Sequence, residues 1–183
     1  MYRQTYRFLV AVLLGVSLAA GAAPSAQAYV LKSWYWLSFP VKYKWGANLA
    51  GANLSTTQQA WKTAFQSATN DWYNTPTIVA FSYDATAATE FNTYSAADNL
   101  FGKNGTTYSA ATSLASKCLS FGNTYAGYST TANQRRSTAG HELGHCLGLA
   151  DSNVAQALMR TGRNRDLIYT PQQDDIDGIN AKY

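Results

Sequence analysis

Both histidines of this 183-residue chain lie in one stretch, STAGHELGHCLGLADS, at residues 137–152. His141 and His145 stand four residues apart, and Glu142 directly follows the first of them. On a helix, side chains four residues apart lie on one face, so both imidazoles point at one ion and the glutamate points beside it. Two neutral nitrogen ligands and a carboxylate that accepts a proton suit a hydrolytic zinc site. The pattern therefore predicts zinc binding by the two histidines, with Glu142 as general base.

A catalytic zinc ion takes three protein ligands and keeps a fourth position open. The chain has no third histidine, and neither of its glutamates follows the motif, so an aspartate has to supply the third ligand. Asp151 is best placed, because Gly148 can adopt a left-handed conformation, end the helix and turn the chain back toward the metal. The alternatives lie further along the chain, at Asp166, Asp174, Asp175 and Asp177.

Three helices are expected. The first starts at the capping box of Ser55 and Gln58 and ends at Asn74-Thr-Pro76, and the second covers about residues 133–147 and carries the histidines. The third is the C-terminal helix, with Thr170 as N-cap, Pro171 in its first position and Gln173 completing the box. The first helix has apolar residues at helical spacing: Trp61, Ala64, Phe65, Ala68 and Trp72.

Strands are expected between these helices, which gives an α+β order. Residues 37–45 alternate between apolar and polar, and Pro40 makes this strand an edge strand or introduces a bulge. Residues 77–83 form the next strand, Asn104-Gly105 marks a turn, and two Tyr- and Thr-rich strands follow at 106–115 and 121–129. An extended substrate is expected to pair with an edge strand within residues 106–117.

The first 28 residues have the composition of a secretory signal peptide. A basic start precedes an apolar run at 8–20, which is too short to span a bilayer, and a small-residue site ends at Ala28. Residues 29–183 then form one domain, secreted to the extracellular medium, and we expect neither a membrane span nor an oligomer. In that oxidising compartment Cys118 and Cys146, the two cysteines of the chain, are expected to form a disulfide.

Charge gives no support to a nucleic-acid-binding function. The chain carries 14 Lys and Arg against 10 Asp and Glu, and its net charge of +4 includes Arg3 and Arg7 of the predicted signal peptide. The remaining basic residues are scattered, and only Arg135 and Arg136 are adjacent.

The stretch H-E-L-G-H-C-L-G-L-A-D resembles the extended zinc motif of the metzincin metallopeptidases, and its aspartate resembles the snapalysin family. The segments around Met159 and the final TPQQDDIDGINAKY are similar to matrixins. The resemblance implies a zincin-like fold: a twisted, mostly parallel sheet and two long helices over an active-site cleft. A small C-terminal subdomain then carries a Met-turn at Met159 and a final helix.

The resemblance also implies an activity, that of a secreted zinc endopeptidase with one catalytic zinc ion and a protein or peptide substrate bound in extended form. Matrixins use a third histidine where this chain has Asp151, and they hold a second, structural zinc with histidines that this chain lacks. Calcium binding stays open. Oxyanion stabilisation is assigned either to a strand tyrosine or to Arg160.

Two alternatives to this interpretation remain. One is a secreted, zinc-stabilised binding module without catalysis, which would have no need of Glu142. The other is a peptidase of the aspzincin type with Asp166 as third ligand, which the segment GRNRDLIY suggests. Loss of zinc on substitution of Asp151 or of Asp166 would separate the two ligand assignments.

Overall fold

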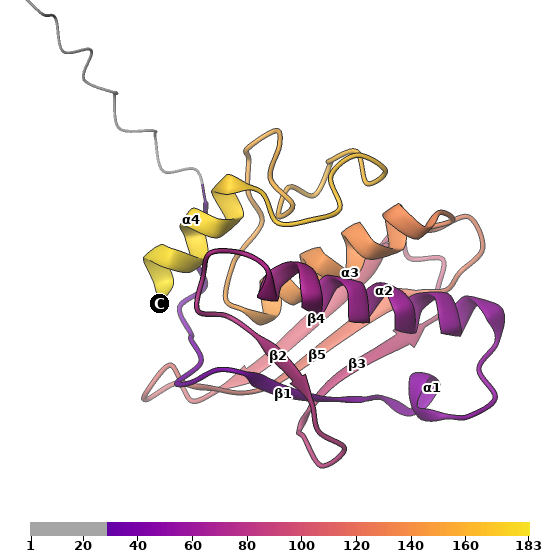
Figure 1. The fold of residues 1–183 in the computed structure, drawn as a ribbon, viewed down its shortest axis with the longest axis horizontal. Helices are drawn as coiled ribbons and strands as arrows, with labels where there is room; N and C mark the ends of the chain where they lie inside the picture. Colours follow the sequence, from indigo (N-terminus) through magenta and orange to yellow (C-terminus); the bar gives the residue numbers. More distant parts are fainter. Residues whose placement is uncertain (1–28) are drawn as a thin grey trace, which may run out of the picture.

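The computed structural model describes residues 29–183, so the predicted signal peptide lies outside the described residues. These residues form a five-stranded sheet with two long helices on one face and a fourth helix at the C-terminus (Figure 1). Among them, no helix is long and apolar enough to cross a bilayer. In chain order the elements are β1 Val41–Trp45, α1 Ala47–Ala50, α2 Thr56–Tyr73, β2 Phe81–Tyr83, β3 Thr89–Tyr94, β4 Gly102–Tyr108, β5 Ala115–Asn123, α3 Ala132–Cys146 and α4 Gln173–Lys182.

The sheet has the strand order β2-β1-β3-β5-β4. All its pairings are parallel except that between β4 and β5, which is antiparallel and leaves β4 at the edge. Helices α2 and α3 lie side by side over the sheet, and the segment between α3 and α4 continues beyond them (Figure 1). This is the mostly parallel sheet with two long helices that the sequence led us to expect.

Helix α2 begins and packs as predicted. The Ser55 side chain accepts a hydrogen bond from the Gln58 N–H, and the Gln58 side chain accepts one from the Ser55 N–H, which completes the capping box. The five predicted apolar residues all lie in the core between the helix, the sheet and α3. Trp72 also donates from Nε1 to the carbonyl of Gly140, and this bond ties α2 to the middle of α3.

The strand predictions are correct only in part. β1 starts one residue after Pro40, because proline has no N–H to give to the ladder, and it lies between β2 and β3 rather than at an edge. The strand predicted at 77–83 is shorter and covers only β2. β3, where Thr89, Phe91 and Thr93 are buried in alternation, was missed because Thr, Glu and Asn dilute its apolar pattern.

The predicted turn at Asn104-Gly105 is wrong, since both residues lie inside β4. The Asn104 side chain donates to Ser120 Oγ and to the Glu142 carbonyl, and these tertiary contacts outweigh the local turn preference. The predicted strand at 121–129 is also misplaced, because β5 covers Ala115–Asn123. β4 forms one edge of the sheet and overlaps the predicted 106–117 only at its C-terminal end.

Helix α4 begins later than predicted. Gln172, and not Thr170, is the N-cap, because its N–H donates to the side chain of Asp175, three residues on.

The predicted disulfide is present: Cys118 of β5 and Cys146 of α3 are bonded, with their Cα atoms 5.7 Å apart. It joins the residue directly after His145 to the sheet.

Candidate metal centre

Helix α3 places both histidines on one face. Its N-terminus is closed by a capping box between Thr131 and Gln134, and its second half is almost entirely buried between α2 and the sheet. His141 and His145 face the segment that follows the helix, and their ring centroids lie 4.6 Å apart. Because the helix is held on both sides, the fold sets where both histidines stand on it.

Asp151 reaches the histidines because the chain reverses at Gly148. That glycine has φ of 89°, and an added Cβ would overlap the Lys182 side chain. The returning segment is held by the start of the described chain: the Lys32 N–H donates to the Gly148 carbonyl at 2.8 Å, and the Ala150 N–H donates to the Val30 carbonyl at 2.7 Å. Two backbone hydrogen bonds therefore fix the approach of Asp151.

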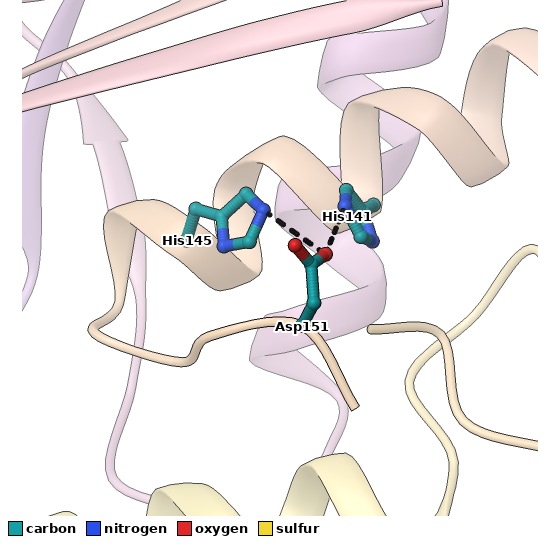
Figure 2. A group of neighbouring side chains, drawn as sticks. All are labelled: His141, His145 and Asp151. Atoms are coloured by element: carbon teal, nitrogen blue, oxygen red, sulfur yellow. Dashed lines mark ion pairs between the residues drawn. The ribbon is translucent and has the colours of Figure 1, made fainter. Parts of the chain in front are cut away.

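The three side chains converge on one point (Figure 2). Asp151 Oδ1 lies 3.3 Å from His141 Nε2 and 3.6 Å from His145 Nε2, and all three atoms lie within 4.8 Å of one another. Ligands about 2.0–2.1 Å from a tetrahedral zinc ion are separated by about 3.4 Å. The observed spacing fits that geometry, and the donor set of two imidazole nitrogens and one carboxylate oxygen is one that zinc accepts.

Backbone carbonyls orient both imidazoles. His141 Nδ1 lies 3.0 Å from the Leu158 carbonyl, and His145 Nδ1 lies 2.9 Å from the Leu149 carbonyl. The Leu149 carbonyl only accepts hydrogen bonds, so His145 Nδ1 carries the proton and its Nε2 keeps a free lone pair. His141 Nδ1 also lies 3.1 Å from Nη1 of Arg163, which only donates, so this nitrogen has both an acceptor and a donor beside it. The Nε2 atoms of both rings face Asp151.

The charges of these groups also suit a cation. Burial lowers the pKa of His141 to about 4, so this imidazole is neutral at pH 7. The hydrogen bond to His141 lowers the pKa of Asp151 to about 2, so this carboxylate is anionic. The Asp151 side chain is 59% exposed, which leaves the point of convergence open to solvent on one side.

Glu142 lies beside this group and lines the same cavity. Its carboxylate packs against Gly102 at the start of β4, where an added Cβ would lie 2.8 Å from Glu142 Oε1. Burial raises the pKa of Glu142 to about 8, and the charge of Arg163 opposes this rise. A carboxylate of this kind takes up a proton readily near neutral pH.

Met159 forms the floor below the histidines. Its sulfur occupies the space that a side chain on Gly144 would need, so it packs directly against α3. Asp175 of α4 holds this floor, because its carboxylate accepts hydrogen bonds from the N–H groups of Leu158 at 2.8 Å and Met159 at 3.0 Å. The same carboxylate caps its own helix, so α4 and the floor form one unit.

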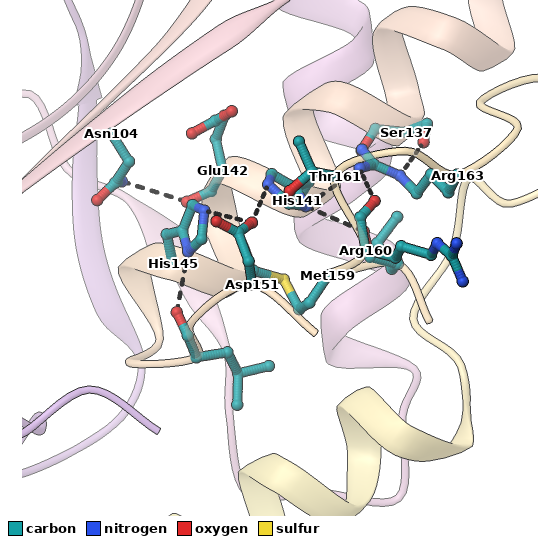
Figure 3. Close-up of polar contacts among 12 residues, drawn as sticks. Asn104, Ser137, His141, Glu142, His145, Asp151, Met159, Arg160, Thr161 and Arg163 are labelled. Atoms are coloured by element: carbon teal, nitrogen blue, oxygen red, sulfur yellow. Dashed lines mark hydrogen bonds and ion pairs between the residues drawn. The ribbon is translucent and has the colours of Figure 1, made fainter. Parts of the chain in front are cut away.

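Arg163 is buried beside His141, a contact that the sequence pattern did not predict. It donates to the side chain and the carbonyl of Ser137, both at 2.8 Å, and to the Arg160 carbonyl at 2.9 Å (Figure 3). Nothing in the sequence distinguishes this arginine from the exposed ones near it. The Arg160 side chain points away from the histidines in the same view, so it is badly placed for oxyanion stabilisation.

The other candidate ligands lie elsewhere. Asp166 accepts hydrogen bonds from Thr131 and Gln134 at the N-terminus of α3, Asp174 accepts one from Ser152, and Asp177 is exposed on α4. Among the described residues, only His141, His145 and Asp151 form such a metal-binding group.

A cavity of about 450 Å³ connects the metal-ligand group to Glu142. It is lined by the residues before β4, by α3 and by the segment after Met159. A second cavity, of about 640 Å³, lies between α2 and the start of α3 and contains none of these groups.

The family model for Matrixin matches residues 41–183. The chain belongs to the matrixin family. Matrixins are zinc-dependent metallopeptidases that act on proteins or peptides, so the site described above belongs to a protein of a metallopeptidase family. Both histidines of the chain are in the group described above, together with Asp151.

The other comparisons add little to this assignment. No curated protein matches the chain. One solved structure that resembles it is described as "GM1 bound form of the ECX AB5 holotoxin", with 14% sequence identity and a TM-score of 0.49, over 77% of this matrixin and 78% of that chain. A similarity of this size carries no functional information.

Proposed function

We propose that this matrixin is a secreted zinc endopeptidase of the snapalysin-like type. The observation that carries the proposal is the convergence of His141 Nε2, His145 Nε2 and Asp151 Oδ1 within 4.8 Å, with both Nδ1 atoms hydrogen-bonded to carbonyls. These three residues would hold one zinc ion and leave its fourth position open toward the cavity.

A zinc ion bound there supplies Lewis acidity, which polarises a peptide carbonyl and acidifies water. Glu142 accepts a proton from the attacking water and delivers it to the amine that leaves when the C–N bond breaks. Its burial beside Gly102 keeps the carboxylate out of bulk water.

The substrate is proposed to lie extended along β4. This strand is at the edge of the sheet, so its outward N–H and C=O groups are free to pair with another chain. β4 starts at Gly102 beside Glu142, which brings a bound peptide past the general base. The Asn104 side chain fixes β4 against α3 by donating to the Glu142 carbonyl at 3.2 Å.

The main test compares the zinc content and casein hydrolysis of residues 29–183 with those of Glu142→Gln. We expect one zinc ion per chain in both proteins and a loss of activity of at least about 10³-fold in the variant. Asp151→Asn should lose zinc, whereas Asp166→Asn should keep it and serves as the matched control. Zinc in both proteins with activity in neither would favour the non-catalytic binding module.

Secretion is tested separately, by sequencing the N-terminus of the protein from the culture medium of a producing cell. The signal peptide proposal expects Tyr29 as the first residue, because cleavage should follow Ala28. Recovery of the chain only from cell lysate, with Met1 intact, would refute it.

A further inference from the structure

Two guanidinium groups line the cavity next to the candidate metal ligands, those of Arg163 and Arg165. Arg163 is fully used by the protein, because its three nitrogens donate to Ser137 and Arg160, as described above. Arg165 is different, because most of its donors have no acceptor.

Arg165 is held in place mainly by stacking. Its Cζ atom lies 3.9 Å from the centre of the Phe101 ring, and Nη2 donates to the Thr161 carbonyl at 3.1 Å. Within residues 29–183 that carbonyl is its only hydrogen-bond acceptor, and Nε is buried without a partner. A flat guanidinium fixed on an aromatic ring, with donors left over, is prepared to receive a ligand oxygen.

The charged residues that line the cavity also favour a carboxylate ligand for Arg165. The lining carboxylates are those of Glu142 and Asp151, which the proposed function assigns to proton transfer and to zinc. Both guanidinium groups line this side of the cavity. With both carboxylates assigned to those roles, the lining has no further carboxylate to pair with Arg165.

We propose, on the basis of the peptidase function above, that Arg165 determines specificity by binding a substrate carboxylate next to the scissile bond. A guanidinium and a carboxylate form two parallel charge-assisted hydrogen bonds, and the donors of Arg165 supply one side of that pair. The carboxylate belongs either to an Asp or Glu side chain of the substrate or to its C-terminus. Both sources present the same chemistry to the cavity.

The experiment uses internally quenched peptides that differ at single positions on either side of the cleaved bond, where Glu, Gln or Leu is placed. Each peptide is made with a free and with an amidated C-terminus, and the protein is the zinc-loaded 29–183 chain. We expect kcat/KM for the best Glu peptide to exceed that of the matching Gln peptide by about tenfold or more. If the bound carboxylate is the C-terminus, the free-acid peptide should exceed its amidated form by the same factor.

Three variants test whether Arg165 causes the preference for a carboxylate. Arg165→Gln should lower the ratio to about one, and Arg165→Lys should give an intermediate ratio, because lysine keeps the charge but loses the planar fork. Arg160→Gln removes a neighbouring positive charge whose side chain points away from the site, so it should keep the wild-type ratio. Zinc content and melting temperature confirm that each variant is folded.

A binding assay tests the role of Arg165 independently of the peptidase function. Fluorescence anisotropy with labelled Glu and Gln peptides on the Glu142→Gln protein needs no turnover, and Arg165→Gln in that background should remove the Glu preference. A wild-type protein that binds with this preference but cleaves nothing would refute only the proposed function. The role of Arg165 would be overturned if Glu and Gln peptides, and also free-acid and amidated peptides, had equal rates and affinities. A preference for the Leu peptides would overturn it as well.

Discussion

Asp175 gives the most direct test of how the site is held. It is buried on α4, and its Oδ2 accepts hydrogen bonds from the N–H groups of Leu158 and Gln172, while Oδ1 accepts one from Met159. Asp175→Ala leaves the buried N–H groups of Leu158 and Met159 without an acceptor. At about 2 kcal/mol for each unsatisfied buried donor, the expected loss is about 4 kcal/mol, because solvent can reach only the half-buried Gln172.

Asp175→Asn should cost about half as much. The asparagine oxygen can replace Oδ2 and serve two donors, but its amide nitrogen then faces the Met159 N–H, which leaves one buried donor without an acceptor. The order of stability is therefore wild type, Asn, Ala, in steps of about 2 kcal/mol.

The assay is urea unfolding of the oxidised, zinc-free protein, in which metal binding cannot mask the loss. Asp177→Asn is the matched control, since Asp177 is exposed on the same helix and accepts a hydrogen bond from the exposed Gln173, and it should change stability by less than about 0.5 kcal/mol. Equal, small losses for Ala and Asn at position 175 would show that these hydrogen bonds do not hold the floor of the site.

Three further perturbations have expected results. Replacing both Cys118 and Cys146 by Ala should lower the free energy of unfolding by about 3.6 kcal/mol, since the bridge spans 28 residues, and urea unfolding measures this loss. Gly148→Ala should lose about 1–2 kcal/mol and bind zinc more weakly, because φ is 89° there; a Kd equal to that of the wild type would contradict the role of this turn. A chelator should lower Tm, and zinc at about 100 times its Kd should restore about 2.7 kcal/mol; an unchanged Tm would argue against a bound ion.

The parts of the fold with strong local signals could be predicted from the sequence. The capping box at Ser55 and the regular spacing of the apolar residues after it specify α2, and the H-E-x-x-H pattern sits on α3 as expected. The disulfide followed from having two cysteines and the expectation of export. In each case a few residues close in sequence, or a single pair, carry the information.

The parts that depend on distant contacts could not be predicted. Asn104 looks like a turn residue until its amide is seen to donate to Ser120 and to the Glu142 carbonyl. Asp175 resembles an ordinary acidic residue near a helix N-terminus, and its link to the Met159 N–H appears only in three dimensions. The burial of Arg163 beside His141 likewise has no counterpart in local sequence.

The pairing of residues 30–32 with residues 148–150 has a consequence for the order of folding. The two partners are separated by most of the chain, so closing this contact has a large entropy cost, and it should form after α3 and the β4–β5 pair, which are local. Asp151 follows directly on the paired segment. A nascent chain should therefore position its histidine pair before Asp151, the proposed third ligand, and it should bind zinc tightly only after this pairing has formed.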